Sequence, residues 1–152
     1  MDISLLRRVP LFEILKDDDL EAIARVTITR GYDKDQVIIL AEEEGDALFI
    51  IAAGQVKVSI VSEDGREVIL SLLGEGAVFG ELALLDGKPR SANVVATEDT
   101  QLYMVRRPDF LQLVYKVPQI AVGLLAELAS RLRKTDRKIE GLALLDVTSR
   151  IS

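Results

Sequence analysis

The spacing of apolar residues divides the chain into a helical beginning, a long middle part and a helical end. In residues 1–26 apolar side chains recur at helical intervals, and three consecutive aspartates suit the start of a short helix from about Asp17 to Arg25. From Thr27 to Val105 the apolar residues instead form short runs rich in Val, Ile, Leu and Phe, at 36–40, 47–53, 55–61, 67–73, 93–96 and 100–105. This change of period predicts strands in the middle of the chain.

Turn residues that include glycine separate these runs, at 45–46, 54, 64–65, 74–76 and 86–87. Many short strands with glycine turns between them favour a sandwich or jelly roll over alternating strands and helices. The run 55–61 alternates in polarity, which predicts Val56, Val58 and Ile60 on one face of the strand and Lys57 and Ser59 on the other.

After Arg106 the pattern becomes helical again. Pro108 and Asp109 suit the start of a short helix, and Pro118 suits the first turn of a long one. The long helix carries a heptad stripe with Thr135 at its polar place, and its apolar members are Ala121, Leu125, Leu128, Leu132, Ile139 and Leu142. Such a seam predicts self-association through the helix 117–144, or a helix that lies along its own domain.

Composition narrows the function classes. The 152 residues suit one domain with a real core, and the chain contains neither cysteine nor histidine. We therefore expect no disulfide framework, iron–sulfur cluster or thiolate metal site, and no histidine-ligated metal or haem. The net charge of −6 argues against DNA binding by this polypeptide alone, but leaves room for a local anion pocket.

The chain also lacks the signals of a membrane or secreted protein. No stretch approaches the roughly 18 uninterrupted apolar residues of a membrane span. The beginning, MDISLLRRVPLF, carries an early Asp2 and has no long apolar core, so it does not read as a signal peptide. We expect a soluble, cytoplasmic, non-redox protein that does not contact a membrane.

The segment 79–96, FGELALLDGKPRSANVVA, carries the strongest chemical signal. Gly80 permits close approach of the backbone to a ligand, and amides at a helix start near Leu82 form an anion site. Arg90 can make a bidentate contact to a phosphate and Ser91 can donate a hydroxyl. Glu81 fits beside a bound anion if it accepts a hydrogen bond from a sugar hydroxyl. The segment therefore suits a small sugar phosphate, and the alternative is a surface turn with a solvated Arg and Ser.

The same segment resembles the phosphate-binding cassette of cyclic nucleotide-binding domains, F-G-E-x-x-x-L followed by a short loop and R-[ST]-A. The resemblance implies that Gly80, Glu81, Leu82, Arg90 and Ser91 bind the cyclic phosphate and the ribose 2′-hydroxyl. A second stretch of the family, G-D-x-x-F-x-I-x-x-G-x-V, is matched at Gly45, Asp46, Phe49, Ile51, Gly54 and Val56. The implied fold is mainly β with flanking helices, a double-stranded β-helix (jelly roll), followed by a long C-terminal helix.

The run 130–147, SRLRKTDRKIEGLALLDV, resembles the central helix of the catabolite activator proteins of the bacterial Crp/Fnr family. That resemblance implies that Thr135 reads the adenine amino group of cyclic AMP. The next residue in the best-known activators is a serine that reaches the nucleotide of the partner subunit, whereas this chain has Asp136. Aspartate can accept from an amine but can also repel a second anionic ligand. A threonine that only packs in the seam is the alternative.

This resemblance predicts three parts: a cyclic nucleotide-binding domain at 1–116, a dimerisation helix at 117–144, and the stub of a missing DNA-binding domain at 145–152. The predicted function is the effector and dimerisation part of a transcription factor whose full-length form binds DNA. The predicted mechanism is a population shift, in which cyclic AMP bridges the cassette and the long helix.

The sequence can also be compared with the requirements of other functions. A jelly-roll enzyme of the cupin type is disfavoured because such sites usually need histidines, so we expect no catalysis. A ligand-free interaction module usually lacks the cassette Arg or Glu, both of which are present here. Within the ligand-binding class, cyclic GMP and cyclic di-GMP are the rival effectors. A regulatory domain of a kinase or channel shares the cassette, but the helix with Thr135 and the ending LLDVTSRIS favour the transcription factor.

Overall fold

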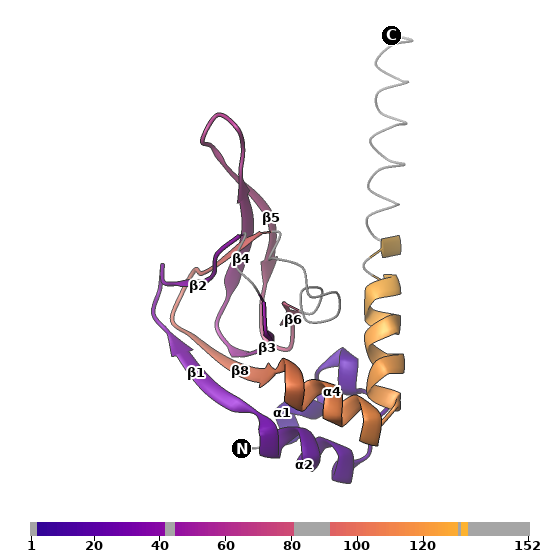
Figure 1. Ribbon diagram of the computed structural model, residues 1–152. Helices are drawn as coiled ribbons and strands as arrows, with labels where there is room; N and C mark the ends of the chain where they lie inside the picture. The colour runs from indigo at the N-terminus through magenta and orange to yellow at the C-terminus, as the bar shows by residue number, and fades with distance from the viewer. Residues whose placement is uncertain (1–2, 42–44, 81–91, 131, 134–152) are drawn as a thin grey trace, which may run out of the picture.

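The computed structural model describes residues 3–41, 45–80, 92–130 and 132–133, which form two four-stranded sheets beside a group of helices (Figure 1). The sheets have the strand orders β1-β8-β3-β6 and β2-β7-β4-β5, and every pairing is antiparallel. The strands are β1 (Ile28–Tyr32), β2 (Val37–Ile39), β3 (Ala47–Ala53), β4 (Val56–Val61), β5 (Glu67–Leu73), β6 (Val78–Phe79), β7 (Asn93–Ala96) and β8 (Thr100–Arg106). This arrangement is the jelly roll with flanking helices predicted from the sequence.

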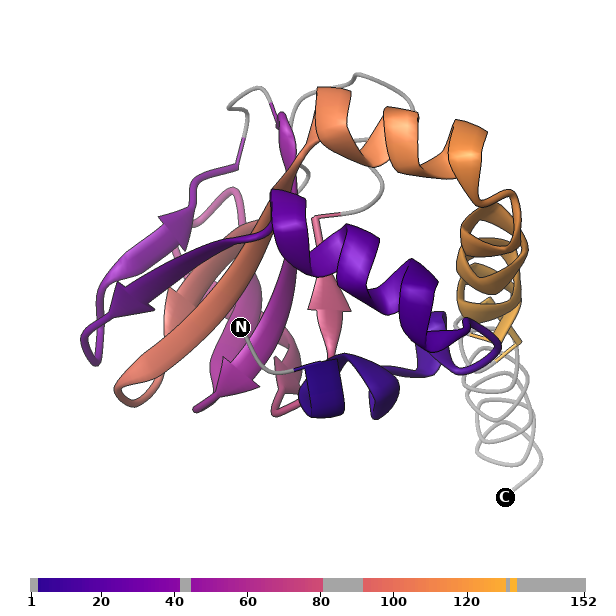
Figure 2. The same cartoon turned by 90° about the horizontal axis from the view of Figure 1, so that it is seen from below.

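The helices gather on one side of the strands, as Figure 2 shows from below. They are α1 (Ile3–Arg7), the 3-10 helix η1 (Pro10–Phe12), α2 (Asp17–Val26), α4 (Arg107–Lys116) and a C-terminal helix that spans Gln119–Ser130. The aspartates at 17–19 occupy the first turn of α2, where acidic groups favour the helix dipole, and Asp19 accepts a bond from the Lys16 amide. The acidic run therefore starts the helix as predicted.

Two buried clusters meet at β3, an inner strand of its sheet. Its residues Phe49 and Ile51 face the space between the sheets, whereas Leu48 and Ile50 pack against the helices. A strand buried on both faces needs apolar residues throughout, which explains the unbroken run ALFIIAA. The helices thus cover the outer face of the sheet that contains β3.

The C-terminal helix belongs to the helical cluster over its described length. Ile120 and Leu124 are buried there beside residues of α1, η1 and α4, and Leu128 packs partly against the same cluster. No single helix among the described residues is long and apolar enough to cross a membrane. The pair of α4 and the C-terminal helix meets that test only together, with a bend of 112° between them. The predicted division into 1–116, 117–144 and 145–152 stays a prediction, because residues 134–152 lie outside the described part.

Burial along β4 does not follow the polarity of its residues at every position. Val56 is buried and Val58 packs partly against the cluster between the sheets, as expected, but Ser59 is buried as well. The pairing with β5 shifts register between Val58 and Ser59. The extra residue of that shift, Leu70, lies in β5, and the pairing of β4 with β7 continues in register through Ser59.

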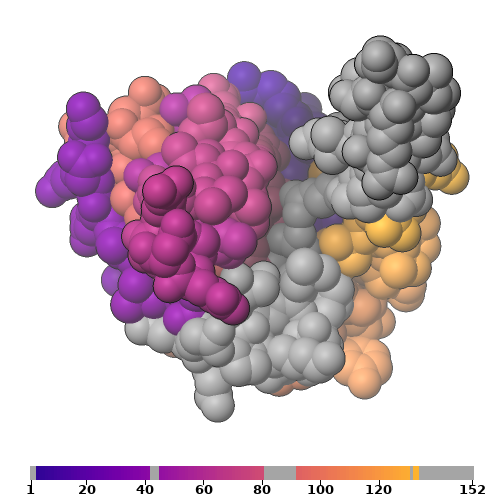
Figure 3. Space-filling model, turned by 90° about the horizontal axis from the view of Figure 1, so that it is seen from above, coloured from indigo at the N-terminus to yellow at the C-terminus, as the bar shows by residue number. Residues whose placement is uncertain are grey.

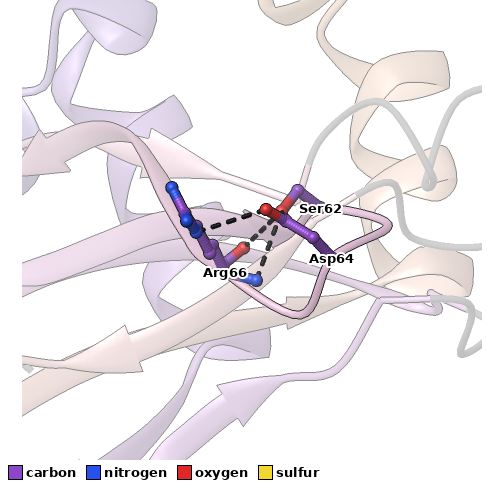
Figure 4. A network of polar contacts seen from close by, with 3 residues as sticks. All are labelled: Ser62, Asp64 and Arg66. Carbon is purple, nitrogen blue, oxygen red and sulfur yellow. Dashed lines mark hydrogen bonds and ion pairs between the residues drawn. The ribbon is translucent and has the colours of Figure 1, made fainter.

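The β4–β5 hairpin projects beyond the rest of its sheet in Figure 1 and lies toward the viewer in the space-filling view of Figure 3. Although β5 is apolar, its side chains are exposed, including Val68, Ile69, Leu70 and Leu72. A network of polar contacts closes the tip (Figure 4): the Ser62 hydroxyl donates to the Asp64 carboxylate, and Arg66 Nε lies 3.2 Å from Asp64 Oδ2. The Arg66 amide also donates to Ser62 Oγ at 3.2 Å.

Candidate ligand-binding site

The segment 79–96 begins on a strand that is held on both sides. In β6, Phe79 pairs with Phe49 and Val78 pairs with Ile50 of β3. The side chain of Phe79 is buried between the sheets, whereas that of Val78 is buried in the helical cluster. Val78 and Phe79 therefore fix the start of the segment to the helical cluster and to the cluster between the sheets.

The turn that leads into β6 is tied to β3 by backbone hydrogen bonds. The Gly76 amide donates to the Ile51 carbonyl at 2.8 Å, and the Ile51 amide donates to the Ala77 carbonyl at 2.9 Å. Gly76 has a φ of 85°, a conformation that favours glycine. These bonds fix the path of the chain two residues before Val78.

Gly80 follows β6 directly and has a φ of 86°. In this left-handed region a side chain would clash with the backbone, so glycine is the residue that turns the chain here at low cost. The sequence pattern predicts a close approach of the Gly80 backbone to a ligand. The structure adds a conformational reason for glycine at the start of the cassette.

The far end of the segment is held by β7, an inner strand of the other sheet between β2 and β4. Val94 of β7 is buried in the same cluster as Phe79 of β6. The Asn93 side chain accepts a hydrogen bond from the Ala41 amide at 2.8 Å. The cassette thus connects two strands from different sheets whose apolar side chains share one core.

Of the predicted site residues, the structure describes Gly80 alone. The others, Glu81, Leu82, Arg90, Ser91, Thr135 and Asp136, lie outside the described residues. The structure therefore describes the strands on either side of the predicted site, β6 and β7, which we call its frame, rather than the geometry of its polar groups. Among the described residues, no group of three or more acidic side chains could hold a metal ion.

The second predicted motif, at 45–56, has a packing role in the described structure. Phe49, Ile51 and Val56 are all buried in the cluster between the sheets. A Cβ at Gly54 would lie 2.5 Å from Thr100 Oγ1 and 2.7 Å from the Asp99 carbonyl oxygen, so the turn at Gly54 needs a glycine. This motif shapes the sandwich that holds the cassette.

The strand β6 is not predicted by the sequence pattern. Its two residues are too few to show a period, and they follow a turn with two glycines. The only signal available was the pair of apolar side chains immediately before the Gly-Glu of the cassette. Val78 and Phe79 are nevertheless the residues that join the cassette to both cores.

Comparisons with known proteins agree with this frame. Residues 29–116 match the sequence model of the family described as Cyclic nucleotide-binding domain. The "Cyclic AMP receptor protein" of Thermus thermophilus is 36% identical over 143 residues, which are 94% of this chain and 66% of that protein. The chain therefore spans about two thirds of the length of this relative.

Solved structures show the same arrangement. The crystal structure of the Thermus thermophilus catabolite activator protein matches 88% of this chain and 63% of its own, with a TM-score of 0.82 and 37% identity. The regulatory domain of Toxoplasma gondii protein kinase A, solved with cyclic AMP, matches 73% of this chain and 42% of its own, with a TM-score of 0.68 and 28% identity.

Proposed function

Because the chain belongs to the family of cyclic nucleotide-binding domains, we propose that it is the effector-binding part of a bacterial transcriptional regulator and that its effector is cyclic AMP. Its resemblance to the catabolite activator proteins holds along most of its length. One observation carries the proposal: the sequence FGELALLDGKPRSA begins in the buried strand β6, and its Gly80 has a left-handed backbone conformation.

In this proposal the cassette binds the sugar phosphate. The backbone at Gly80 and Leu82 donates to the cyclic phosphate, which the guanidinium of Arg90 and the hydroxyl of Ser91 also contact. Glu81 accepts from the ribose 2′-hydroxyl, a neutral donor that is compatible with a carboxylate beside an anion. An arginine and backbone amides suit a phosphate because they supply several directed donors at once.

Thr135 and Asp136 form the base-reading part of the proposed site. The threonine hydroxyl accepts from the adenine amino group, and in this proposal Asp136 accepts from the base bound by the partner subunit. Both residues fall in the predicted helix 117–144, so the ligand would join the sandwich to that helix. A ligand that binds one relative position of these parts better than another shifts the population toward that position.

We further propose that two copies of the chain associate through the helix 117–144. Leu125 and Leu132 support this, because their side chains are 67% and 63% exposed although they belong to the heptad stripe. The apolar side chains of β5 are exposed as well, which leaves further surface for a second copy. In the full-length regulator, a change in this helix pair would reposition the DNA-binding domains.

The proteins compared above are named as a receptor protein, an activator protein and a regulatory domain, and we propose a cytoplasmic regulator without catalytic activity rather than an enzyme. The rival effectors are cyclic GMP and cyclic di-GMP, and a ligand-free interaction module is the second candidate. A domain for another effector and a ligand-free module would both have this fold. Ligand-binding measurements therefore distinguish these alternatives from the proposal.

Titration calorimetry of the chain against cyclic AMP, cyclic GMP and cyclic di-GMP tests this proposal. We expect saturable binding of cyclic AMP and weaker binding of the other two. Tighter binding of cyclic GMP or cyclic di-GMP would assign a different effector. Absence of heat with all three, in a folded sample, would favour the interaction module.

A further inference from the structure

The C-terminal helix touches the backbone of η1 at a glycine. A Cβ at Gly123 would lie 2.3 Å from the carbonyl oxygen of Leu11 and 3.3 Å from its carbonyl carbon. Both atoms belong to the backbone, so no change of side-chain rotamer could make room for it. Any larger residue at 123 must therefore move the helix away from η1, or η1 away from the helix.

The residues around this contact are buried. Ile120 and Leu124 lie one turn before and one residue after Gly123, and both share a cluster with Leu11. Glycine is a poor helix former, so its presence inside this helix runs against local preference. The close approach to Leu11 gives a physical reason for it.

The same cluster extends to the entrance of the cassette. Val78, two residues before Gly80, belongs to the same buried cluster as Leu11, Ile120 and Leu124. The segment just before Leu11 also meets the turn that leads into β6: Arg8 lies 3.3 Å from the carboxylate of Glu75, and its carbonyl oxygen would be 3.8 Å from a Cβ at Gly76. Residues 8–11 therefore contact the C-terminal helix on one side and the approach to the cassette on the other.

We propose that Gly123 is a positioning residue for the nucleotide site. By allowing the helix to dock on Leu11, it holds the helix and the strand that enters the cassette in one packed unit, and so sets the affinity for the ligand. Gly123 acts through Leu11 and Val78 and does not touch the nucleotide. This inference rests on the proposed function, because the affinity concerned is that for cyclic AMP.

The variant Gly123→Ala tests the inference by calorimetry with cyclic AMP. Displacement of the helix should raise the dissociation constant about three- to thirtyfold, the range of couplings carried through packed residues. The matched control is Gly31→Ala, because Gly31 is exposed in β1 and a Cβ there meets no atom within 4 Å. A folded Gly123→Ala with the native dissociation constant would overturn the proposal.

Two further measurements keep the test decisive. If Gly123→Ala does not fold, Leu124→Ala takes its place, since it loosens the same contact by removing a buried side chain. Native affinity in that variant would equally contradict the inference. Hydrogen exchange of the unliganded protein tests the docking itself: Gly123→Ala should speed exchange in the C-terminal helix and in β6, whereas unchanged exchange there would refute it. Failure of the native protein to bind any cyclic nucleotide would refute the proposed function without altering the exchange result.

Discussion

The phenyl ring of Phe79 stacks on that of Phe49, with the ring centroids 5.1 Å apart and 12° between the planes. Both side chains are buried between the sheets, so the residue before Gly80 is fixed to the neighbouring inner strand β3. We expect Phe79→Ala to lower the free energy of unfolding by about 3–5 kcal/mol, through lost burial and the cavity left behind.

Chemical denaturation followed by circular dichroism measures this change. Phe79→Leu is the matched control, because it keeps most of the apolar volume and removes the ring; its loss should be clearly smaller. A loss below about 1 kcal/mol in Phe79→Ala, the size of an average substitution, would show that β6 is not an anchor.

The positions of most strands along the chain could be predicted from the sequence, for identifiable reasons. β3, β5 and β7 match the predicted runs 47–53, 67–73 and 93–96 residue for residue, because glycine turns or loops bound each run. β1 was missed as a run, since its sequence ITRGY has few apolar residues and is exposed along most of its length. Apolar runs between glycine turns are visible in a sequence, but short or polar edge strands are defined only by their partners.

The burial of individual side chains was harder to predict. Ser59 is buried although it is polar, and the alternation of polarity in β4 does not indicate this. The C-terminal helix presents buried Ile120 and Leu124 as well as the exposed seam residue Leu125, so it has two apolar sides rather than the one stripe that the heptad suggested. Gly123 could have been noticed as a glycine inside a strong helical pattern, but its reason lies in Leu11, which is far away in the chain.

For the candidate site, the sequence supplied the residue types and the structure supplied the frame. Gly80 has the left-handed conformation that explains its identity. The roles of Glu81, Arg90 and Thr135 come from the resemblance and stay predictions, because these residues lie outside the described part. These predicted roles are therefore tested by measuring the nucleotide affinity of variants at the three positions.

The tip of the β4–β5 hairpin gives a prediction about pH. The hydrogen bond from the Ser62 hydroxyl lowers the pKa of the exposed Asp64 carboxyl, and backbone hydrogen bonds act in the same direction. Because the folded-state pKa is depressed, this contribution to stability is present above the pKa of the unfolded chain and is lost as pH falls through the folded-state value. Ser62→Ala should raise the pKa of Asp64 toward its ordinary value.

Titration of the Asp64 carboxyl carbon by nuclear magnetic resonance measures this pKa. Ser71→Ala is the control, since Ser71 is exposed in β5 and takes no part in the network at the tip. An unchanged pKa in Ser62→Ala would mean that the hydroxyl does not hold the carboxylate.

Sedimentation tests the proposed dimer. The native chain should sediment as a dimer, and Leu132→Glu should break it by placing like charges opposite each other in the seam. The control is Ser130→Glu, an exposed position off the heptad stripe, which should remain dimeric. A native chain that is monomeric at micromolar to millimolar concentration would refute self-association through this helix.

Thr135→Val keeps the shape of the side chain and removes the hydroxyl. A base-reading threonine should lose about 0.5–1.5 kcal/mol of cyclic AMP affinity, the usual net contribution of one hydrogen bond. The variant should also lose part of the preference for cyclic AMP over cyclic IMP, which lacks the adenine amino group. A variant that stays dimeric and keeps the native preference would assign Thr135 to packing in the seam.

The central claim is that the segment that starts at Gly80 binds a cyclic phosphate through Arg90. Calorimetric titration of cyclic AMP into the native chain and into Arg90→Ala tests it most directly. If the guanidinium pairs with the phosphate in a partly desolvated site, the variant should lose about 2–5 kcal/mol of binding free energy. Arg90→Lys should recover only part of that loss, because lysine lacks the bidentate fork. Native affinity in a folded Arg90→Ala would contradict the assignment of this segment as the phosphate-binding cassette.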